Sequence, residues 1–550
     1  MSAVLTARSH GSKVEVESLR TETSTTWANP DGTMTTDAHM APIRFKTAKG
    51  TWQSIDLTLA EAADGTIAPR SHQFGLQLGK RDGAAGGVFA AATAGSGRQV
   101  EWMAPWKLPE PTLDGTKAIY AEVQPGVDLR LDARRSGFET DFVVKQRPAS
   151  APVWRIPLRT KGLTARQATD GAIEFVDAKD VVRSRIPVGQ MWDAVSDAHT
   201  GLPVNTAAAA MSVEQVSPGK ATLVIAPDAT WFLDPARVFP VTVDPTYANT
   251  PLYSSFDTFV QSGWTSDLSS TVDLRAGKNG TTTERSFLNF PGAAFQGKDI
   301  TAASLSLYQY GATTCTATQL NLHAALPAST ATRWTSQPVT SATVWGSVSA
   351  AKGFSSACAA GRISVPMTGL AQYWSGQTDT TVGVALKAAN EADANAWKRF
   401  VSSEGDADPY ISLTWNRSAN PPATVETSEA IAYAAPGDTT SYMYSPSLRP
   451  WVRTKATDPD GNTVKYVFEF FTGDGPTFNL LGTCTSSVYA SGTTQAADRP
   501  PIFLTTRCCM CGRRRTTAVS TARGRATRPG CGWVRRSLQT RWCRARRRTT

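Results

Sequence analysis

Apolar residues alternate with small or polar residues in short runs along most of the chain. Leu305 and Leu307 alternate with serines, and every second residue of Val127–Leu131 is aliphatic. A period of two gives a strand one apolar and one polar face. Clusters of Gly, Ser, Asn, Asp and Pro separate the runs at short spacing, and helical signals are sparse. The pattern predicts an all-β protein of antiparallel sheets.

These runs fall into successive units. Residues 23–246 predict an N-terminal, sandwich-like all-β scaffold domain, and residues 251–416 predict a jelly-roll β-sandwich. Residues 417–440 are rich in Pro, Ala, Ser and Thr and predict a linker. Residues 441–498 look like the first strands of an immunoglobulin- or fibronectin-like domain, with only part of the fold present.

Both ends of the chain are expected to be disordered. Residues 1–22 are polar and lack the apolar segment of a signal peptide, so they predict a leader remnant whose export signal lies upstream. The C-terminal unit, 499–550, holds five of the eight cysteines and, from residue 501 on, 14 Arg with no Lys, Asp or Glu. With few branched aliphatic residues it predicts a disordered tail, typical of a frameshift product of GC-rich DNA. A basic nucleic-acid-binding arm and a Cys-rich metal site are the alternatives.

Charge and hydropathy narrow the class of protein. The formal net charge of +10 comes from the tail, and the remaining residues are slightly acidic. We therefore predict no nucleic-acid partner. Charged residues make up only 19% of the chain, which is typical of a secreted β-rich protein. No apolar run approaches the length of a transmembrane helix, so no transmembrane segment is predicted.

Five motifs occur in order in the second unit. They are Asp257–Val260, Leu274–Gly277, Arg285–Leu288, Trp334–Pro338 and Ala389–Phe400. In this order and spacing they resemble the DNRLRE module, a jelly-roll family classed with carbohydrate-binding modules. The resemblance implies that this unit binds a polysaccharide or cell-wall glycan without catalysing a reaction.

The first unit also contains ordered motifs. ANPDGT, KGTWQSIDLTL, KLPEPTLDGTKAIYAEVQPGVDLRL and VFPVTVDPT precede the second unit. They resemble the N-terminal portion of large secreted, cell-wall-associated bacterial proteins, many of which carry RHS/YD repeats and a C-terminal toxin. This resemblance implies an extracellular or wall-associated location. It also supplies the alternative function, a ligand-free scaffold that is the truncated front of an RHS-type toxin-delivery or surface protein.

Candidate glycan-binding residues follow from the chemistry of sugars, whose C–H faces stack on exposed aromatic rings. Trp264 lies in a Gly/Ser/Thr/Asp loop with no apolar partner nearby in the sequence, Trp345 lies in a similar loop, and Trp397 matches the module pattern. These three are the candidate platforms, with packing in the core as the alternative. Asp257 and Lys398 are candidate hydroxyl contacts, with solvated strand ends as the alternative.

Two further features concern stability. Cys315 and Cys358 each lie in a Ser/Thr/Ala-rich loop of the second unit, and in an exported domain we expect them to form a disulfide. Two buried free thiols are the alternative. Glu404, Asp406 and Asp408 precede the last strand of this unit, and they are candidate ligands of a structural calcium ion, with a polar turn as the alternative.

Recognisable catalytic motifs are absent from the sequence. It contains no H-E-x-x-H, no G-x-S-x-G and no G-x-x-x-x-G-K-[ST], and its five histidines are scattered. We therefore predict that the protein is not an enzyme and needs no catalytic cofactor. A glycan-processing enzyme is the second alternative, since carboxylate pairs can converge in three dimensions.

Overall fold

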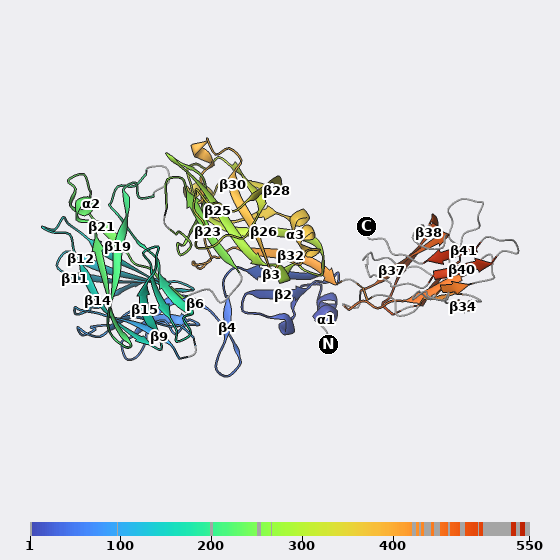
Figure 1. The fold of residues 1–550 in the computed structure, drawn as a ribbon, viewed down its shortest axis with the longest axis horizontal. Coiled ribbons are helices and arrows are strands. Elements are labelled where there is room, and N and C mark those ends of the chain that lie inside the picture. The colour runs from blue at the N-terminus through green and yellow to red at the C-terminus, as the bar shows by residue number, and fades with distance from the viewer. Residues whose placement is uncertain are drawn as a thin grey trace.

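The computed structural model describes residues 3–95, 97–197, 202–249, 255–265, 267–417 and 419–420, and separate segments between 425 and 544. It confirms the predicted all-β class, with large curled antiparallel sheets in a sandwich-like arrangement (Figure 1). The helices among these residues are short: α1 (Ala3–His10), α2 (Ala229–Leu233), α3 (Thr368–Ser375) and the single turns η1 (Glu17–Leu19), η2 (Gly292–Ala294), η3 (Ser356–Cys358) and η4 (Ala394–Ala396). None of the described helices is long and apolar enough to cross a membrane.

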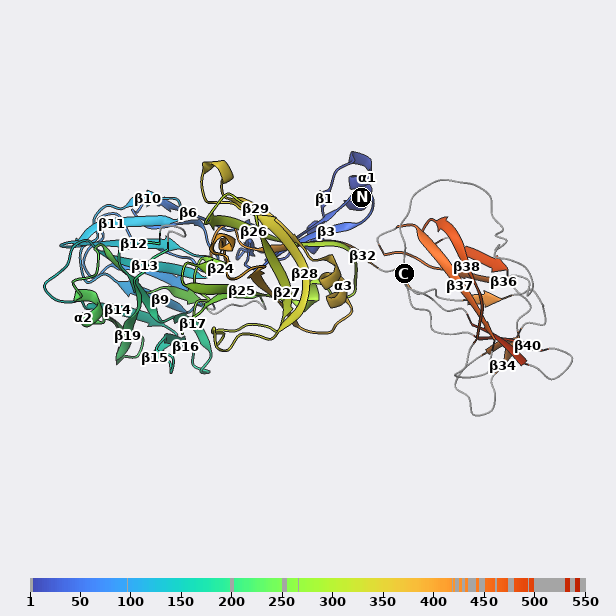
Figure 2. The same ribbon diagram turned by 90° about the horizontal axis from the view of Figure 1, so that it is seen from above.

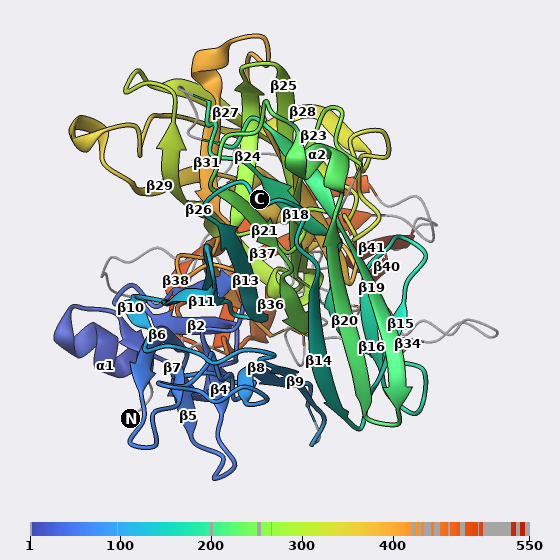
Figure 3. The same ribbon diagram turned by 90° about the vertical axis from the view of Figure 1, so that its left-hand side faces the viewer.

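The first domain is built on one 15-stranded sheet. Its core contains stacked aromatic rings, including Phe142 and Trp154 with centroids 4.5 Å apart. Hairpins β4–β5 and β6–β7 precede it, and the β4–β5 hairpin projects from the molecule (Figure 3). The main path of the sheet runs β15 (Thr164–Gln167), β16 (Ile173–Val176), β17 (Val182–Ile186), β22 (Tyr247–Asn249), β13 (Gly137–Val144), β21 (Val241–Asp244), β18 (Gly189–Trp192), β19 (Thr206–Ser217), β20 (Lys220–Pro227), β14 (Trp154–Lys161), β9 (Gln99–Met103) and β8 (Val88–Thr93). The remaining strands are β10 (Thr112–Asp114), β11 (Lys117–Gln124) and β12 (Val127–Ala133) in this sheet, and β4 (Arg44–Lys46), β5 (Trp52–Ser54), β6 (Asp56–Glu61) and β7 (Ile67–Ser71) in the hairpins.

The second domain is a 13-stranded sheet that curls around one core. Strand β24 joins the two halves of this sheet, because it pairs with β31 on one side and with β25 on the other. Figure 2 shows it beside the first domain. Its path runs β1 (Val14–Glu15), β2 (Ser24–Ala28), β3 (Met34–His39), β32 (Tyr410–Arg417), β26 (Lys298–Ala312), β31 (Lys398–Val401), β24 (Asp273–Asn279), β25 (Thr282–Pro291), β30 (Thr381–Ala388), β27 (Thr318–Ala325) and β28 (Thr340–Ala350). Two strands lie off this path, β23 (Phe256–Gln261) on β25 and β29 (Gly361–Pro366) on β26.

The N-terminal residues belong to the second domain. β3 pairs antiparallel with β32, placing Met34 opposite Trp415, and the indole N–H of Trp415 donates to Thr36 Oγ1 at 2.9 Å. Helix α1 buries Val4 and Ala7 in the same core. The predicted boundary at residue 23 therefore differs from the structure, as does the disordered leader predicted for 1–22, because these residues supply core side chains and cover a sheet edge.

A clasp holds the two domains together. Arg135 lies in the turn between β12 and β13, and its guanidinium donates to the carbonyls of Pro42, Gly405 and Asp406 at 2.5, 3.0 and 2.9 Å. It also lies 3.5 Å from the Asp408 carboxylate. We call Arg135 and these four partners the Arg135 clasp. Because the arginine is buried and its donors are met by the other domain, the contact fixes one domain against the other.

The predicted disulfide is confirmed. Cys315 and Cys358 are bonded, with their Cα atoms 5.6 Å apart. The bond closes the chain around β27 and β28, so it constrains this hairpin in the unfolded state as well as in the folded one.

The C-terminal segments form smaller sheets (Figure 1). The predicted immunoglobulin-like region contains strands, the longest being β37 and β38, which form a hairpin. Most of the predicted linker and tail lies outside the described residues, but β40 and β41 pair within the tail, which the sequence did not predict. The strands are β33 (Val425–Thr427), β34 (Ile431–Tyr433), β35 (Tyr442–Tyr444), β36 (Trp451–Lys455), β37 (Val464–Thr472), β38 (Asn479–Tyr489), β39 (Thr494–Asp498), β40 (Gly530–Val534) and β41 (Thr540–Arg544).

Deleting residues 1–40 is expected to destabilise the second domain by at least about 3 kcal/mol. The deletion uncovers β32 and removes buried Met34 and Met40, each of which contributes roughly 1.5–3 kcal/mol. Urea denaturation followed by tryptophan fluorescence measures the change. Removing Ala48–Gly50 from the exposed tip of the β4–β5 hairpin is the control and should leave the curve unchanged. Equal stability of the deletion variant and the intact chain would contradict the assignment of these residues to the domain.

Candidate functional site

A cleft of about 420 Å³ lies between the two domains. Strands β13, β18 and β21 form its first-domain wall, and β24, β31 and the loop before β24 form its second-domain wall. The lining combines an aromatic ring with many hydrogen-bonding side chains, a composition typical of sites for polar ligands. The polar and aromatic lining includes Glu139, Gln190, Asp244, Gln261, Trp264, Asp273, Arg275, Asn279 and Arg399.

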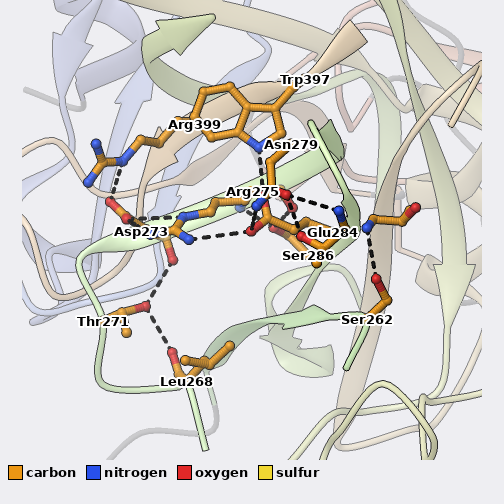
Figure 4. Close-up of polar contacts among 12 residues, drawn as sticks. Ser262, Leu268, Thr271, Asp273, Arg275, Asn279, Glu284, Ser286, Trp397 and Arg399 are labelled. Carbon is orange, nitrogen blue, oxygen red and sulfur yellow. Dashed lines mark hydrogen bonds and ion pairs between the residues drawn. The ribbon is translucent and has the colours of Figure 1, made fainter. Parts of the chain in front are cut away.

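A network of buried charges supports the second-domain wall (Figure 4). Asp273 accepts from Arg275 Nη2 at 2.5 Å and from Arg399 Nε at 2.9 Å. Glu284, which is fully buried, accepts from the Trp397 indole at 2.6 Å, from Asn279 at 2.9 Å and from Arg275 at 3.3 Å. Arg275 thus joins both carboxylates, and the network fixes the orientation of the cleft-facing guanidinium groups.

Strand β24 brings this network together because Asp273 and Arg275 are two residues apart and share one face. The intervening Leu274 and the following Ala276 are fully buried in the core. Gly277 has a φ of +107°, and a Cβ there would lie 2.8 Å from the Ala396 carbonyl oxygen. Glycine therefore permits the close approach of β24 to the segment that carries Trp397.

The two carboxylates of the network differ in pKa. Burial alone would raise the pKa of Asp273, but the guanidinium groups of Arg275 and Arg399 outweigh it and hold the pKa well below its ordinary value. For Glu284 the burial effect prevails, and its pKa is raised despite Arg275 and the Trp397 indole. Asp273 is therefore the permanent negative charge of the network.

The opposite wall is acidic. Carboxylate oxygens of Glu139, Asp141 and Asp244 lie within 4.8 Å of one another, a spacing that metal ligands can adopt. Burial raises the pKa of Asp141, and burial with the neighbouring Asp141 charge raises that of Asp244. Arg134 pairs with Glu139 and offsets part of the repulsion among the three carboxylates.

The predicted ligand-binding residues do not converge. Trp264 lines the cleft, half-buried, and its indole N–H has no hydrogen-bond partner in the described part of the chain. Trp345 lies on β28, with its ring 6.0 Å from that of Tyr373. Trp397 is fully buried, so its predicted role as an exposed platform is wrong and the packing alternative holds. Asp257 and Lys398, the predicted hydroxyl contacts, are both buried, so the alternative of solvated strand ends is wrong as well.

Lys398 and the predicted calcium ligands make contacts of their own. Lys398 donates to Thr318 at 2.5 Å, and burial lowers its pKa to about 8. Glu404 accepts from Ser136 of the first domain, and Asp408 accepts from His39 at 3.2 Å and lies in the Arg135 clasp. Asp406 is exposed. These positions favour a role in joining the domains, and a calcium ion remains a prediction.

Comparison with known proteins gives a partial match. No family model matches the chain. The tRNA nuclease WapA of Bacillus subtilis (strain 168) is 26% identical over 263 residues, which are 46% of this chain and 11% of that protein. The tRNA(Glu)-specific nuclease WapA of Bacillus subtilis subsp. natto is 26% identical and the tRNA3(Ser)-specific nuclease WapA of Bacillus spizizenii 25% identical, with the same coverage. The chain thus spans about a tenth of the length of these relatives.

Comparison with solved structures gives a match that carries no functional information. A Paenibacillus xanthan lyase aligns with 86% of this chain and 47% of its own length, at 10% identity. The TM-score of 0.13 is too low to support an inference.

The relatives correct two predictions. The prediction that the protein is not an enzyme is contradicted, because the relatives are named as nucleases. The prediction of no nucleic-acid partner conflicts with the same relatives, because their names give tRNA as the substrate. The prediction rested on the absence of catalytic motifs from this chain alone, whereas the relatives are far longer than the matched region.

Sequence reasoning missed the buried network. Arg275 and Arg399 lie inside two of the quoted motifs, yet neither was given a role, and Glu284 lies just before a third. Charged residues inside otherwise apolar strands were the available signal, since charges are rarely buried unless paired.

Replacing Asp273 by Asn is expected to destabilise the second domain by about 3–5 kcal/mol, because Arg275 and Arg399 lose their shared partner in a buried site. The measurement is the free energy of unfolding in urea. Glu391→Gln is the matched control, since its ion pair with Arg285 is more exposed and should contribute no more than about 1 kcal/mol. Similar losses of unfolding free energy from both substitutions would show that the buried network stabilises the domain no more than an exposed ion pair does.

Proposed function

We propose that this chain is a rigid scaffold segment of a WapA-like tRNA nuclease that is delivered or displayed outside the cell. The observation that carries the proposal is the match to three WapA nucleases over 263 residues. The resemblance of the N-terminal motifs to wall-associated RHS-type proteins supports the same role. The whole protein's tRNA cleavage belongs to the proposal, because the match covers 11% of the relatives.

The domain contact supports a scaffold role. Ser136 bonds to Glu404, next to the Arg135 clasp, so two neighbouring residues of one turn hold the other domain. Asp408 of the clasp also accepts from His39 of β3, which fixes this carboxylate within the second domain. Two domains joined in this way keep a fixed orientation relative to each other, and a scaffold requires such rigidity.

The test separates scaffolding from catalysis in a chimera. The region of Bacillus subtilis WapA that matches this chain is replaced by residues 3–417, and tRNA cleavage is measured with purified protein and in recipient cells. We expect cleavage by the purified chimera to stay within about twofold of WapA. Arg135→Ala should lower cleavage in recipient cells tenfold or more while purified activity is unchanged, with Arg155→Ala, which removes an exposed ion pair, as control.

Two outcomes would contradict the scaffold role. Loss of cleavage by the purified chimera would place this region in the catalytic machinery. Full cleavage in recipient cells by the Arg135→Ala chimera would show that the domain contact is not needed.

The cleft supports glycan binding as a second candidate function. Trp264 offers a half-buried ring with an unpaired indole N–H among the described residues. Gln190, Gln261, Asn279 and Arg399 line the same cleft and can bond to hydroxyl groups. An aromatic ring beside several such side chains is what a polysaccharide chain requires.

Trp264→Ala should weaken retention of the full chain on cell-wall polysaccharide tenfold or more, because the stacking ring is lost while the core is intact. Affinity electrophoresis on immobilised polysaccharides measures retention. Trp345→Ala is the matched control on another face and should have no effect. Weaker retention of the Trp345 variant alone would move the site to β28, and no retention of the unmodified chain would remove this candidate.

A further inference from the structure

A second cavity between the domains adjoins the cleft and has a different lining. We call it the seam cavity; its volume is about 500 Å³, and it shares Pro187, Asp267 and Ser270 with the cleft. This volume lies in the range of small-molecule sites. Much of its lining is apolar and comes from both domains, including Met40, Phe74, Val182, Phe256 and Ala328.

Asp257 places an uncompensated carboxyl group in this cavity. Its side chain is 3% exposed and accepts from the backbone N–H and the hydroxyl of Ser403, at 2.8 and 2.6 Å. No salt bridge to it is present in the part of the chain that the structure describes. Burial, with the neighbouring charges of Glu404 and Asp408, raises its pKa to about 7. A buried carboxylate normally has a cationic partner, and this one has carboxylates as its charged neighbours.

The lining also contains two arginines, and neither forms a salt bridge to Asp257 among the described residues. Arg135 gives its donors to backbone carbonyls in the clasp. Arg185 pairs with Asp170 through Nη2, and its Nε has no hydrogen-bond partner among the described residues. The carboxyl group of Asp257 is therefore left without a guanidinium partner.

Asn249 adds a neutral acceptor. It is 4% exposed and lines the cavity, and its Nδ2 donates to the Ser136 carbonyl at 3.0 Å, which fixes the orientation of the amide. Its Oδ1 has no hydrogen-bond partner among the described residues. Buried polar atoms are nearly always satisfied, so this oxygen requires a donor from a ligand or water.

We propose that the seam cavity binds a small organic cation, namely a primary ammonium group on an apolar chain. Asp257 supplies the counter-charge, Asn249 accepts a hydrogen bond, and Phe74 and Phe256 contact the chain. An ammonium group has three donors and no acceptor, which suits the carboxylate oxygens of Asp257 and the amide oxygen of Asn249. The seam cavity borders both the Arg135 clasp and the cleft, but this proposal depends on Asp257 and Asn249, which neither the nuclease nor the glycan proposal uses.

The experiment titrates the full chain at pH 8 with n-hexylammonium, n-hexanol and n-hexanoate by calorimetry. We expect hexylammonium to bind with a Kd of about 1 mM, at least tenfold tighter than hexanol, and hexanoate not to bind. At tenfold excess over Kd it should raise Tm by roughly 2–4 °C. Equal affinities for the three probes, or no binding of hexylammonium, would overturn the proposal and leave water as the donor to Asn249.

Asp257→Asn should abolish the preference for hexylammonium over hexanol, since it removes the charge and retains the shape. Asp379→Asn, an equal change of charge at an exposed position of the same domain, is the matched control. Ala248→Leu fills part of the cavity and should weaken both probes. An unchanged preference in the Asp257 variant would overturn the proposal; if that variant does not fold, the ranking of the three probes on the unmodified chain decides.

Discussion

A single buried guanidinium connects the two halves of this molecule. Arg135 finds its partners in a loop of the other domain and in the segment that leads away from β3. An arginine buried in this way is costly unless every donor is met, so the domains must come together in one orientation. The cleft and the seam cavity both lie at this contact, and their shapes therefore depend on it.

Charge is distributed unevenly across the domain contact. The first-domain wall of the cleft carries Glu139 and Asp244, whereas the facing wall presents Arg275 and Arg399. The two walls stabilise their buried charges in different ways. The second domain pairs its charges in a network, whereas in the first domain burial raises the pKa of Asp141 and Asp244 and Arg134 pairs with Glu139. A ligand that enters the cleft thus contacts polar side chains whose positions are fixed before it binds.

The sequence allowed local structure to be predicted better than long-range structure. Period-two runs such as Leu305 and Leu307 became β26, with both leucines buried, because alternation depends only on neighbouring residues. The pairing of β3 with β32 could not be foreseen, since nothing local specifies which distant edge a strand will cover. Trp397 was misjudged for the same reason: its partner Glu284 is 113 residues away and meets it only through the fold. Trp264 is half-buried and lines the cleft, and its role as a stacking platform stays a prediction.

The position of the N-terminal strands has a consequence for biosynthesis. Thr36 and Trp415, which bond across β3 and β32, are 379 residues apart in the chain. At ribosomal rates of about 5–20 residues per second, β3 waits roughly 20–80 s for its partner strand to emerge. During this interval the first domain can fold and β1–β3 can pair with one another, but the edge of β3 that later meets β32 stays unpaired. The contact order of the second domain is therefore high, and its completion is a late event that demands protection of an exposed strand edge.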